Sequence, residues 1–211
     1  TTGPGGMLKA FRTIPVALEI ARAVEQINPE AWIINYTNPT GMITEAVTRY
    51  SGARIVGLCS YGLYPKWVTH LALDVPEDAV TYSYVGLNHF NFAYNIKVAG
   101  RPVTTDEFNK IASVDNWTTL NPQLVQSLQV IPSPYLQYYF HTDRIVSTLK
   151  LEPFSRGEVV QQVERELFQR YADPNCTTKP EALQKRGSGH GGYSEVATGV
   201  MEALYGTRDR G

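Results

Sequence analysis

Two residues able to bind a metal follow the same three-residue string. Cys59 comes directly after Val-Gly-Leu, and His89 comes after Val-Gly-Leu-Asn. A thiolate and an imidazole can together ligate a divalent ion, but these positions are too far apart for a short-range ligand motif. A free cysteine is also typical of a core, and so is a hydrogen-bonded histidine between aromatic neighbours. The residues alone leave both interpretations open.

Two further segments carry polar side chains beside predicted strand ends. In "NYTNPTG", Asn38 fits a helix N-cap before Pro39. Asn35 in the same segment could satisfy buried backbone groups or contact a ligand. The Gly-rich stretch 185–195, which contains Arg186, could bind an anion before a helix or serve as a mobile connection.

A cluster of aromatic residues is the third candidate. Tyr135, Tyr138 and Tyr139 stand at helical i, i+3, i+4 spacing, so core packing is the first explanation. A tyrosine that acts as a base needs its pKa, ordinarily about 10, lowered by a cation or metal. The cluster therefore gains a catalytic interpretation only if a metal site lies nearby.

The composition excludes several classes of protein. The 211 residues include 19 basic and 20 acidic side chains, giving a net charge of −1. This balance argues against a nucleic-acid-binding or polybasic membrane-binding protein. No apolar run reaches membrane-spanning length. Two cysteines form no disulfide framework, so we expect a reducing, cytoplasmic location.

The elements that would position these residues alternate in type. Helical spacing of apolar residues predicts a helix from Pro15 to about Asn28 and another over 39–50. Short apolar runs at 31–35 and 54–59 predict buried parallel strands. We expect "GPGG", near the start, to be a loop.

The remainder of the chain has a different residue pattern. Aromatic and β-branched residues over 80–98 predict an antiparallel strand pair. Helices are predicted over 66–73, 104–113, 121–129, 157–174 and a last segment ending near 206. The fold class is therefore α/β: the second half of a Rossmann-like doubly wound sheet, residues 1–60, joined to a mixed α+β substrate domain, residues 61–211.

The strings taken in order resemble those of glycoside hydrolase family 4, in particular its 6-phospho-β-glucosidases. They are "GPGGMLKAFRTIP", "AWIINYTNPTGMITEAV", "VGLC", "GLNHF", "YLQYY" and "KRG…YSE". The resemblance implies an enzyme that uses NAD and a divalent metal, usually Mn²⁺, with a lactate/malate dehydrogenase-like plan. It implies hydrolysis of a glycoside by oxidation at C3, elimination, water addition and reduction, outside the two-carboxylate scheme of most glycosidases.

The resemblance also assigns roles to residues. Cys59 and His89 would ligate the metal, although Mn²⁺ prefers oxygen ligands. Tyr135 would be the base. Asn38, Asn88 and Arg186 would contact the substrate, and Asn35 would contact the cofactor. The substrate would be a small sugar glycoside, 6-phosphorylated, and we expect a homo-oligomer with no nucleic-acid or membrane partner.

Two departures from the family pattern qualify these roles. Ser60-Tyr61-Gly62 follows Cys59 where the β-specific members have Asn-Val-Pro, which leaves the acid and the anomer preference open. The printed sequence also contains no strand with a dinucleotide fingerprint before "GPGG". We therefore expect an incomplete fragment that does not turn over substrate by itself.

Two other functions remain open on the sequence. A 2-hydroxy-acid dehydrogenase-like oxidoreductase has a related plan and would use His with Arg and Asp, without a metal. A non-catalytic sugar-binding fragment would bind sugar without turnover. Metal analysis separates the first from a family 4 glycosidase, and sugar-induced stabilisation without turnover identifies the second.

Overall fold

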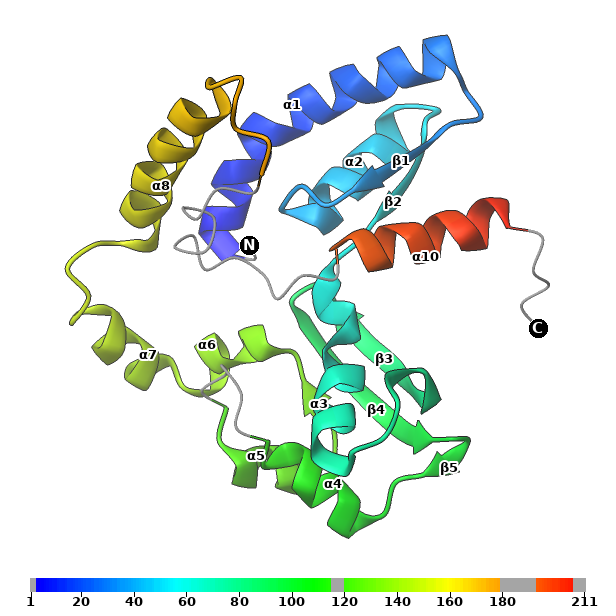
Figure 1. Cartoon of the computed structure of the whole chain (residues 1–211), viewed down its shortest axis with the longest axis vertical. Helices are drawn as coiled ribbons and strands as arrows, with labels where there is room; N and C mark the ends of the chain where they lie inside the picture. The colour runs from blue at the N-terminus through cyan, green and yellow to red at the C-terminus, as the bar shows by residue number, and fades with distance from the viewer. Residues whose placement is uncertain (1–2, 115–119, 179–192, 207–211) are drawn as a thin grey trace. The chain divides into compact units, whose positions relative to one another are not determined.

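The computed structural model describes residues 3–114, 120–178 and 193–206 (Figure 1). The described residues form two compact units, one made of residues 3–136 with 193–206 and one made of residues 137–178. Each unit is described by itself. Within the described ranges, no helix combines the length and the apolar content that crossing a bilayer requires.

The described residues of the larger unit form fifteen elements of secondary structure. They are α1 (Gly3–Ile27), β1 (Trp32–Asn35), α2 (Thr40–Tyr50), β2 (Arg54–Gly57), the 3₁₀ turn η1 (Ser60–Leu63), α3 (Tyr64–Leu73), η2 (Glu77–Ala79), β3 (Val80–Leu87), β4 (Phe90–Val98), β5 (Arg101–Pro102), α4 (Thr105–Ala112), α5 (Pro122–Leu128), β6 (Ile131–Pro132), η3 (Pro134–Leu136) and α10 (Tyr193–Tyr205). The smaller unit contains α6 (Gln137–Phe140), α7 (Thr142–Leu149) and α8 (Arg156–Tyr171).

The first part of the larger unit is a β–α–β arrangement. β1 and β2 pair in parallel, with Asn35 opposite Gly57 at their carboxyl ends. Helix α2 connects the two strands, and α1 packs against α2 through a small core of Ala21, Val47 and Ala53. Both predicted strands are therefore confirmed, and the carboxyl ends of β1 and β2 lie side by side, where open α/β sheets bind their ligands.

Gly57 allows helix α2 to approach strand β2 closely. A Cβ atom at this position would collide with the side chains of Thr44 and Thr40 on α2. Because glycine has no Cβ, the two elements can touch two residues before Cys59.

Two expectations about helix starts were wrong. The "GPGG" segment is the first turn of α1 instead of a loop, and α1 continues through Pro15. A proline removes one backbone hydrogen bond, which a long helix can tolerate. Asn38 is not the N-cap of α2: the helix begins at Thr40, after a cis Asn38–Pro39 peptide bond, and Pro39 occupies the cap position with extended backbone.

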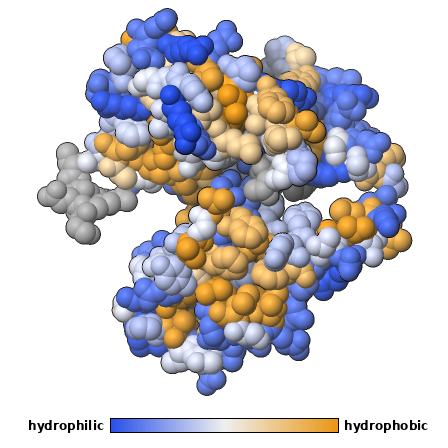
Figure 2. All heavy atoms as spheres, turned by 180° about the vertical axis from the view of Figure 1, so that it is seen from behind, coloured by the Kyte–Doolittle hydropathy of each residue, from blue (hydrophilic) through white to orange (hydrophobic). Residues whose placement is uncertain are grey.

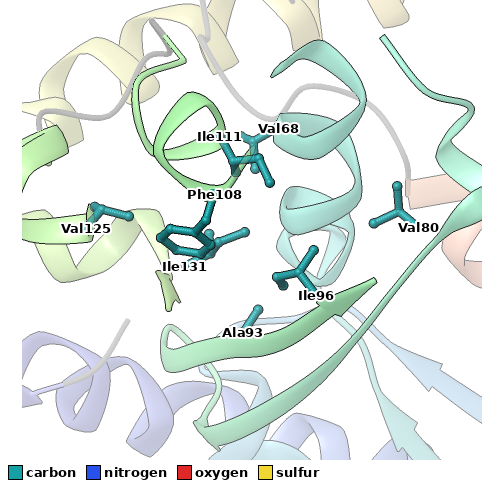
Figure 3. Close-up of a cluster of buried hydrophobic side chains, with 8 residues drawn as sticks. All are labelled: Val68, Val80, Ala93, Ile96, Phe108, Ile111, Val125 and Ile131. Carbon is teal, nitrogen blue, oxygen red and sulfur yellow. The ribbon is translucent and has the colours of Figure 1, made fainter. Parts of the chain in front are cut away.

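An antiparallel sheet forms the second part of the larger unit. β4 pairs with β3, β5 and β6, which confirms the predicted strand pair. Helices α3, α4 and α5 supply the side chains that cover one face of this sheet. Figure 3 shows the resulting core, formed by Val68, Val80, Ala93, Ile96, Phe108, Ile111, Val125 and Ile131.

The opposite face of this sheet carries apolar side chains at the surface. Val85 is 58% exposed and Leu87 is 76% exposed. Figure 2 shows apolar side chains gathered on the part of the molecule that holds this sheet. The hairpin that presents His89 thus has one face in a core and one face at the surface.

The smaller unit is helical. Helix α8 begins with a capping box, in which Ser155 and Glu158 bond each other's backbone N–H groups. Val163 and Leu167 form its buried pair. The helix predicted over 157–174 thus corresponds to α8, which has one apolar face.

Candidate functional site

Strand β2 and the β3–β4 hairpin bring Cys59 and His89 together. Cys59 lies at the start of η1, just beyond the carboxyl end of β2. His89 occupies the turn between β3 and β4, with a positive φ of 66°. Cys59 Sγ lies 3.5 Å from His89 Nε2. The larger unit thus places the two predicted ligand atoms in contact.

Glycine at position 86 is required for the turn that presents His89. Its φ is +116°, and an added Cβ would meet the carbonyl oxygen of Phe90 and the backbone of Asn91. An L-residue is strained in this region of conformation. The repeated Val-Gly-Leu strings thus contain two glycines with steric roles, Gly57 and Gly86.

Burial controls the protonation of both candidate ligands. His89 is 6% exposed, and burial lowers its pKa to about 4. Burial also raises the pKa of Cys59, partly offset by the hydrogen bond that the backbone N–H of Tyr61 donates to Cys59 Sγ. Without a metal, both side chains are therefore neutral near pH 7.

Tyr135 joins this pair from the η3 turn. Its ring stacks on the His89 ring, with centroids 3.9 Å apart and planes 22° apart. The other two tyrosines of the cluster belong to the smaller unit and are exposed there, Tyr138 to 54% and Tyr139 to 69%. Core packing, which the helical spacing suggested, is therefore not borne out for these two residues, whereas Tyr135, in the larger unit, lies beside His89.

Tyr61, which the sequence analysis named only as part of the departing segment Ser60-Tyr61-Gly62, also lies in this site. Its ring makes edge contacts with Tyr135, at a centroid distance of 5.0 Å, and with His89, at 6.4 Å. Burial, followed by the neighbouring phenol of Tyr135, raises the pKa of Tyr61. Its place two residues after Cys59, in a segment that departs from the family pattern, is the sequence signal for this position.

Tyr36 and Tyr193 form a second aromatic pair in the larger unit. The Tyr36 hydroxyl donates to the backbone oxygen of Tyr193 at 2.8 Å, and the two rings meet edge to face at 5.1 Å. Burial raises the pKa of Tyr36, and the charge of the Cys59 thiolate adds to this effect. The start of α10 is thereby tied to the end of β1.

The predicted asparagines occupy the strand ends. Asn35 is buried, its amide oxygen accepts from the Thr37 N–H at 2.9 Å, and its amide nitrogen donates to Thr44 Oγ1 at 3.4 Å. Asn38 Oδ1 accepts from Thr40 Oγ1 at 3.4 Å. Arg186 lies outside the described residues.

A groove of about 440 Å³ lies along α2 and reaches Cys59, one of the two candidate ligands. Its walls are Thr40, Gly41, Thr44, Glu45, Thr48, Arg49, Gly57, Leu58, Cys59 and Asn88. The groove therefore connects Cys59 and Asn88 with a row of hydroxyl groups that can bind a polar ligand.

The donor set fits a single divalent ion. Cys59 Sγ and His89 Nε2 lie 3.5 Å apart, which is close enough for both atoms to bind the same divalent ion. No group of three or more His, Cys, Asp or Glu side chains capable of holding a metal occurs among the described residues. Two protein ligands leave positions for water or substrate, as catalytic metals require.

Comparison with known proteins identifies relatives of the whole chain. The profile described as "Family 4 glycosyl hydrolase" matches residues 1–65, and "Family 4 glycosyl hydrolase C-terminal domain" matches residues 84–210. A probable 6-phospho-beta-glucosidase of Bacillus subtilis (strain 168) is 40% identical over 97% of this chain. The 6-phospho-beta-glucosidase of Escherichia coli (strain K12) is 35% identical over 97% of this chain.

Solved structures give the same relationship. The 6-phospho-beta glucosidase of Thermotoga maritima, with NAD and glucose-6-phosphate, matches with a TM-score of 0.77 and 29% identity over 95% of this chain and 47% of that one. A second structure of it, with manganese, NAD+ and glucose-6-phosphate, matches with a TM-score of 0.72 and 28% identity over 87% of this chain and 44% of that one. The chain spans about half the length of the curated relatives it matches, 49% and 48%.

Proposed function

The chain belongs to glycosyl hydrolase family 4, and from this premise we propose that it carries the metal-binding and proton-transfer residues of a 6-phospho-β-glucosidase. The contact between Cys59, His89 and Tyr135 is the observation that carries this proposal. It provides two ligands for one ion and a phenol directly beside them.

Cys59 and His89 would hold the divalent metal, which we propose to be Mn²⁺. Manganese prefers oxygen ligands, but water and sugar hydroxyls can supply these in the positions that two protein ligands leave free. The Thermotoga maritima relative contains manganese. When bound, the ion would supply positive charge that polarises a sugar oxygen and favours ionisation of a nearby phenol.

Tyr135 would act as the base. A phenol has an ordinary pKa of about 10, so this role needs a cation close by, and the His89 ring on which Tyr135 stacks belongs to the proposed ligand pair. Tyr135 would take the proton from C2 of a sugar oxidised at C3, while the bond from C1 to the leaving group breaks. After water adds at C1, Tyr135 would return the proton to C2.

NAD would supply the oxidation of C3 and its later reduction, so neither step needs a carboxylate pair. The Thermotoga maritima relative binds NAD together with glucose-6-phosphate. We propose that Asn35 lies toward the cofactor, and that Asn38 and Asn88 lie toward a 6-phosphorylated glucoside. Arg186 stays a predicted substrate contact.

The remaining expectations follow this proposal. Both cysteines, Cys59 and Cys176, are free thiols, in keeping with a reducing, cytoplasmic location. The apolar side chains at the surface of the β3–β4 pair favour association with copies of the same protein. The functional division near residue 60, into a nucleotide-binding part and a substrate part, stays a prediction.

The proposal can be tested with a panel of nitrophenyl glycosides. The native polypeptide, meaning the protein as its own cell makes it, should be supplied with NAD⁺, Mn²⁺ and a thiol reductant. It should then hydrolyse 6-phospho-β-glucosides far faster than their unphosphorylated counterparts. Chelation of the metal should abolish this turnover. Sugar-induced stabilisation without turnover would indicate a binding protein, and metal-independent oxidation of a hydroxy acid would indicate a dehydrogenase.

A further inference from the structure

The segment that carries Cys59 is held on both sides by strands of the larger unit. On its amino-terminal side, the Leu58 N–H donates to the last carbonyl oxygen of β1 at 2.9 Å, which continues the pairing of β1 with β2. On its carboxyl-terminal side, the Gly62 carbonyl oxygen accepts from two hydroxyls of β3, that of Tyr82 at 2.7 Å and that of Tyr84 at 2.9 Å. Cys59 therefore lies between a contact with one sheet and a contact with the other.

The η1 turn connects the contact at Gly62 to Cys59. The Gly62 N–H donates to the Cys59 carbonyl oxygen at 3.1 Å, and Cys59 itself occupies the N-cap position of the turn. Tyr84 also approaches the Tyr61 carbonyl oxygen at 3.4 Å. Strand β3 is thus joined to the Cys59 backbone through a short series of hydrogen bonds.

The two phenols of β3 have fixed places of their own. They stand two residues apart, so their side chains lie on the same face of the strand. The Tyr82 ring packs against the core of the antiparallel sheet, and the Tyr84 ring meets it edge to face with centroids 5.3 Å apart. Burial raises the pKa of Tyr82 to about 12 and also raises that of Tyr84, so both hydroxyls remain protonated donors at neutral pH.

The same strand determines the place of His89. Residues 83–87 of β3 pair in continuous register with residues 90–94 of β4, and His89 lies in the turn between them. Strand β3 therefore presents one candidate ligand at its end and holds the segment of the other through its tyrosine hydroxyls. The 3.5 Å contact between Cys59 Sγ and His89 Nε2 joins these two parts.

We propose that Tyr82 and Tyr84 are positioning residues, whose hydroxyls hold the η1 turn on β3 and thereby keep Cys59 in place against His89. This inference rests on the proposed function for the metal role of Cys59 and His89. Groups that surround metal ligands orient them and strengthen metal binding. Without the two hydroxyls, the η1 turn would leave β3 more often and carry Cys59 away from His89.

The test removes the hydroxyls and keeps the rings, with Tyr82→Phe, Tyr84→Phe and the double variant. Alkylation of the metal-free chain by iodoacetamide, followed by mass spectrometry, measures the access to Cys59. The double variant should react at Cys59 about tenfold faster than the unmodified chain. Each single variant should show a smaller increase, because one donor remains at Gly62. Cys176, in the smaller unit, should react at the same rate in every variant.

Tyr94→Phe is the matched control for the loss of a tyrosine hydroxyl. Tyr94 lies on β4 of the same sheet, and its exposure of 44% is close to the 41% of Tyr84. This substitution should leave the reaction of Cys59 unchanged. Low concentrations of urea separate local from global opening: opening of η1 exposes little surface, so the faster reaction should hardly depend on urea, whereas unfolding of the chain would make it rise steeply.

Cobalt binding gives a second readout, which a purely structural role would not change. A thiolate bound to Co²⁺ produces a sulfur-to-metal charge-transfer band in the near ultraviolet. The unmodified chain and Tyr94→Phe should bind Co²⁺ equally tightly and show this band with equal intensity. The double variant should bind Co²⁺ about tenfold more weakly and show a weaker band at saturation.

The outcomes separate the positioning role from the proposed function. The positioning role would be overturned by an unchanged reaction of Cys59 in the double variant, by an equal increase in Tyr94→Phe, by an increase that depends steeply on urea, or by unchanged cobalt binding. If the unmodified chain binds no Co²⁺, or the native polypeptide shows no turnover that depends on NAD and metal, the proposed function fails. The alkylation rates then still decide whether the two tyrosines hold Cys59.

Discussion

Metal binding by the chain should release one proton for each ion, and this proton should come from Cys59. A metal binds the thiolate and the neutral imidazole. Burial raises the pKa of Cys59, so this thiol is protonated at pH 7 before a metal binds. His89, with a pKa lowered to about 4, is protonated in only about one molecule in a thousand at this pH.

The dependence on pH follows from these values. Because the pKa of Cys59 is raised, its thiol is protonated at neutral pH and must lose the proton when it binds a metal. Lower pH therefore weakens metal binding. Between about pH 5 and the pKa of Cys59, the logarithm of the apparent affinity should rise by about one for each pH unit. Below about pH 4, where His89 becomes protonated as well, the slope should approach two.

Isothermal titration with Mn²⁺ or Co²⁺ in buffers of different ionisation enthalpy measures this release. The unmodified chain and His89→Ala should both release about one proton per bound ion at pH 7, with weaker binding in the variant. Cys59→Ser should bind more weakly and release about none. Cys176→Ser serves as the control and should behave as the unmodified chain. A release of about zero or about two protons by the unmodified chain would refute the reasoning.

Two substitutions test the packing around the site. Gly57→Ala places a Cβ against α2 and should lower the free energy of unfolding by about 1–3 kcal/mol in urea titrations. Gly41→Ala, which has open space around it, should not destabilise the chain. Equal effects of the two substitutions on the free energy of unfolding would contradict the packing argument. Thr104→Ala removes the Thr104 side chain from the capping box with Glu107 and should lower the free energy of unfolding by about 1 kcal/mol. Thr105→Ala should have little effect on this free energy. An equally large decrease in Thr105→Ala would contradict the capping explanation.

The strands and most helices were predictable because their signals are local. The apolar runs around Ile33 and Val56 identified two parallel strands, and helix spacing identified α2, α4 and α8. The predicted start of α1 at Pro15 was wrong, since the sequence pattern of a proline inside a long helix resembles that of a proline at a helix start. It also misplaced the cap of α2 by one residue.

The site was less predictable, because its contacts join distant segments. The meeting of Cys59 with His89 depends on where the β3–β4 turn falls relative to the end of β2, which no spacing rule determines. The inward position of Tyr135 depends on the short η3 turn, whereas the helical spacing suggested a shared core face. Tyr61 was named only as part of the departing segment Ser60-Tyr61-Gly62 and received no role, because the sequence pattern around it carries no chemical motif.

The fate of the hydrogen at C2 tests the central claim most directly. The native polypeptide should hydrolyse a 6-phospho-β-glucoside in D₂O, with NAD⁺ and Mn²⁺, to glucose 6-phosphate that carries solvent deuterium at C2, as read by proton NMR. Tyr135→Phe should lose hydrolysis and deuterium incorporation together, by about two orders of magnitude or more. A product that keeps its original hydrogen at C2, formed equally well by Tyr135→Phe, would contradict the account.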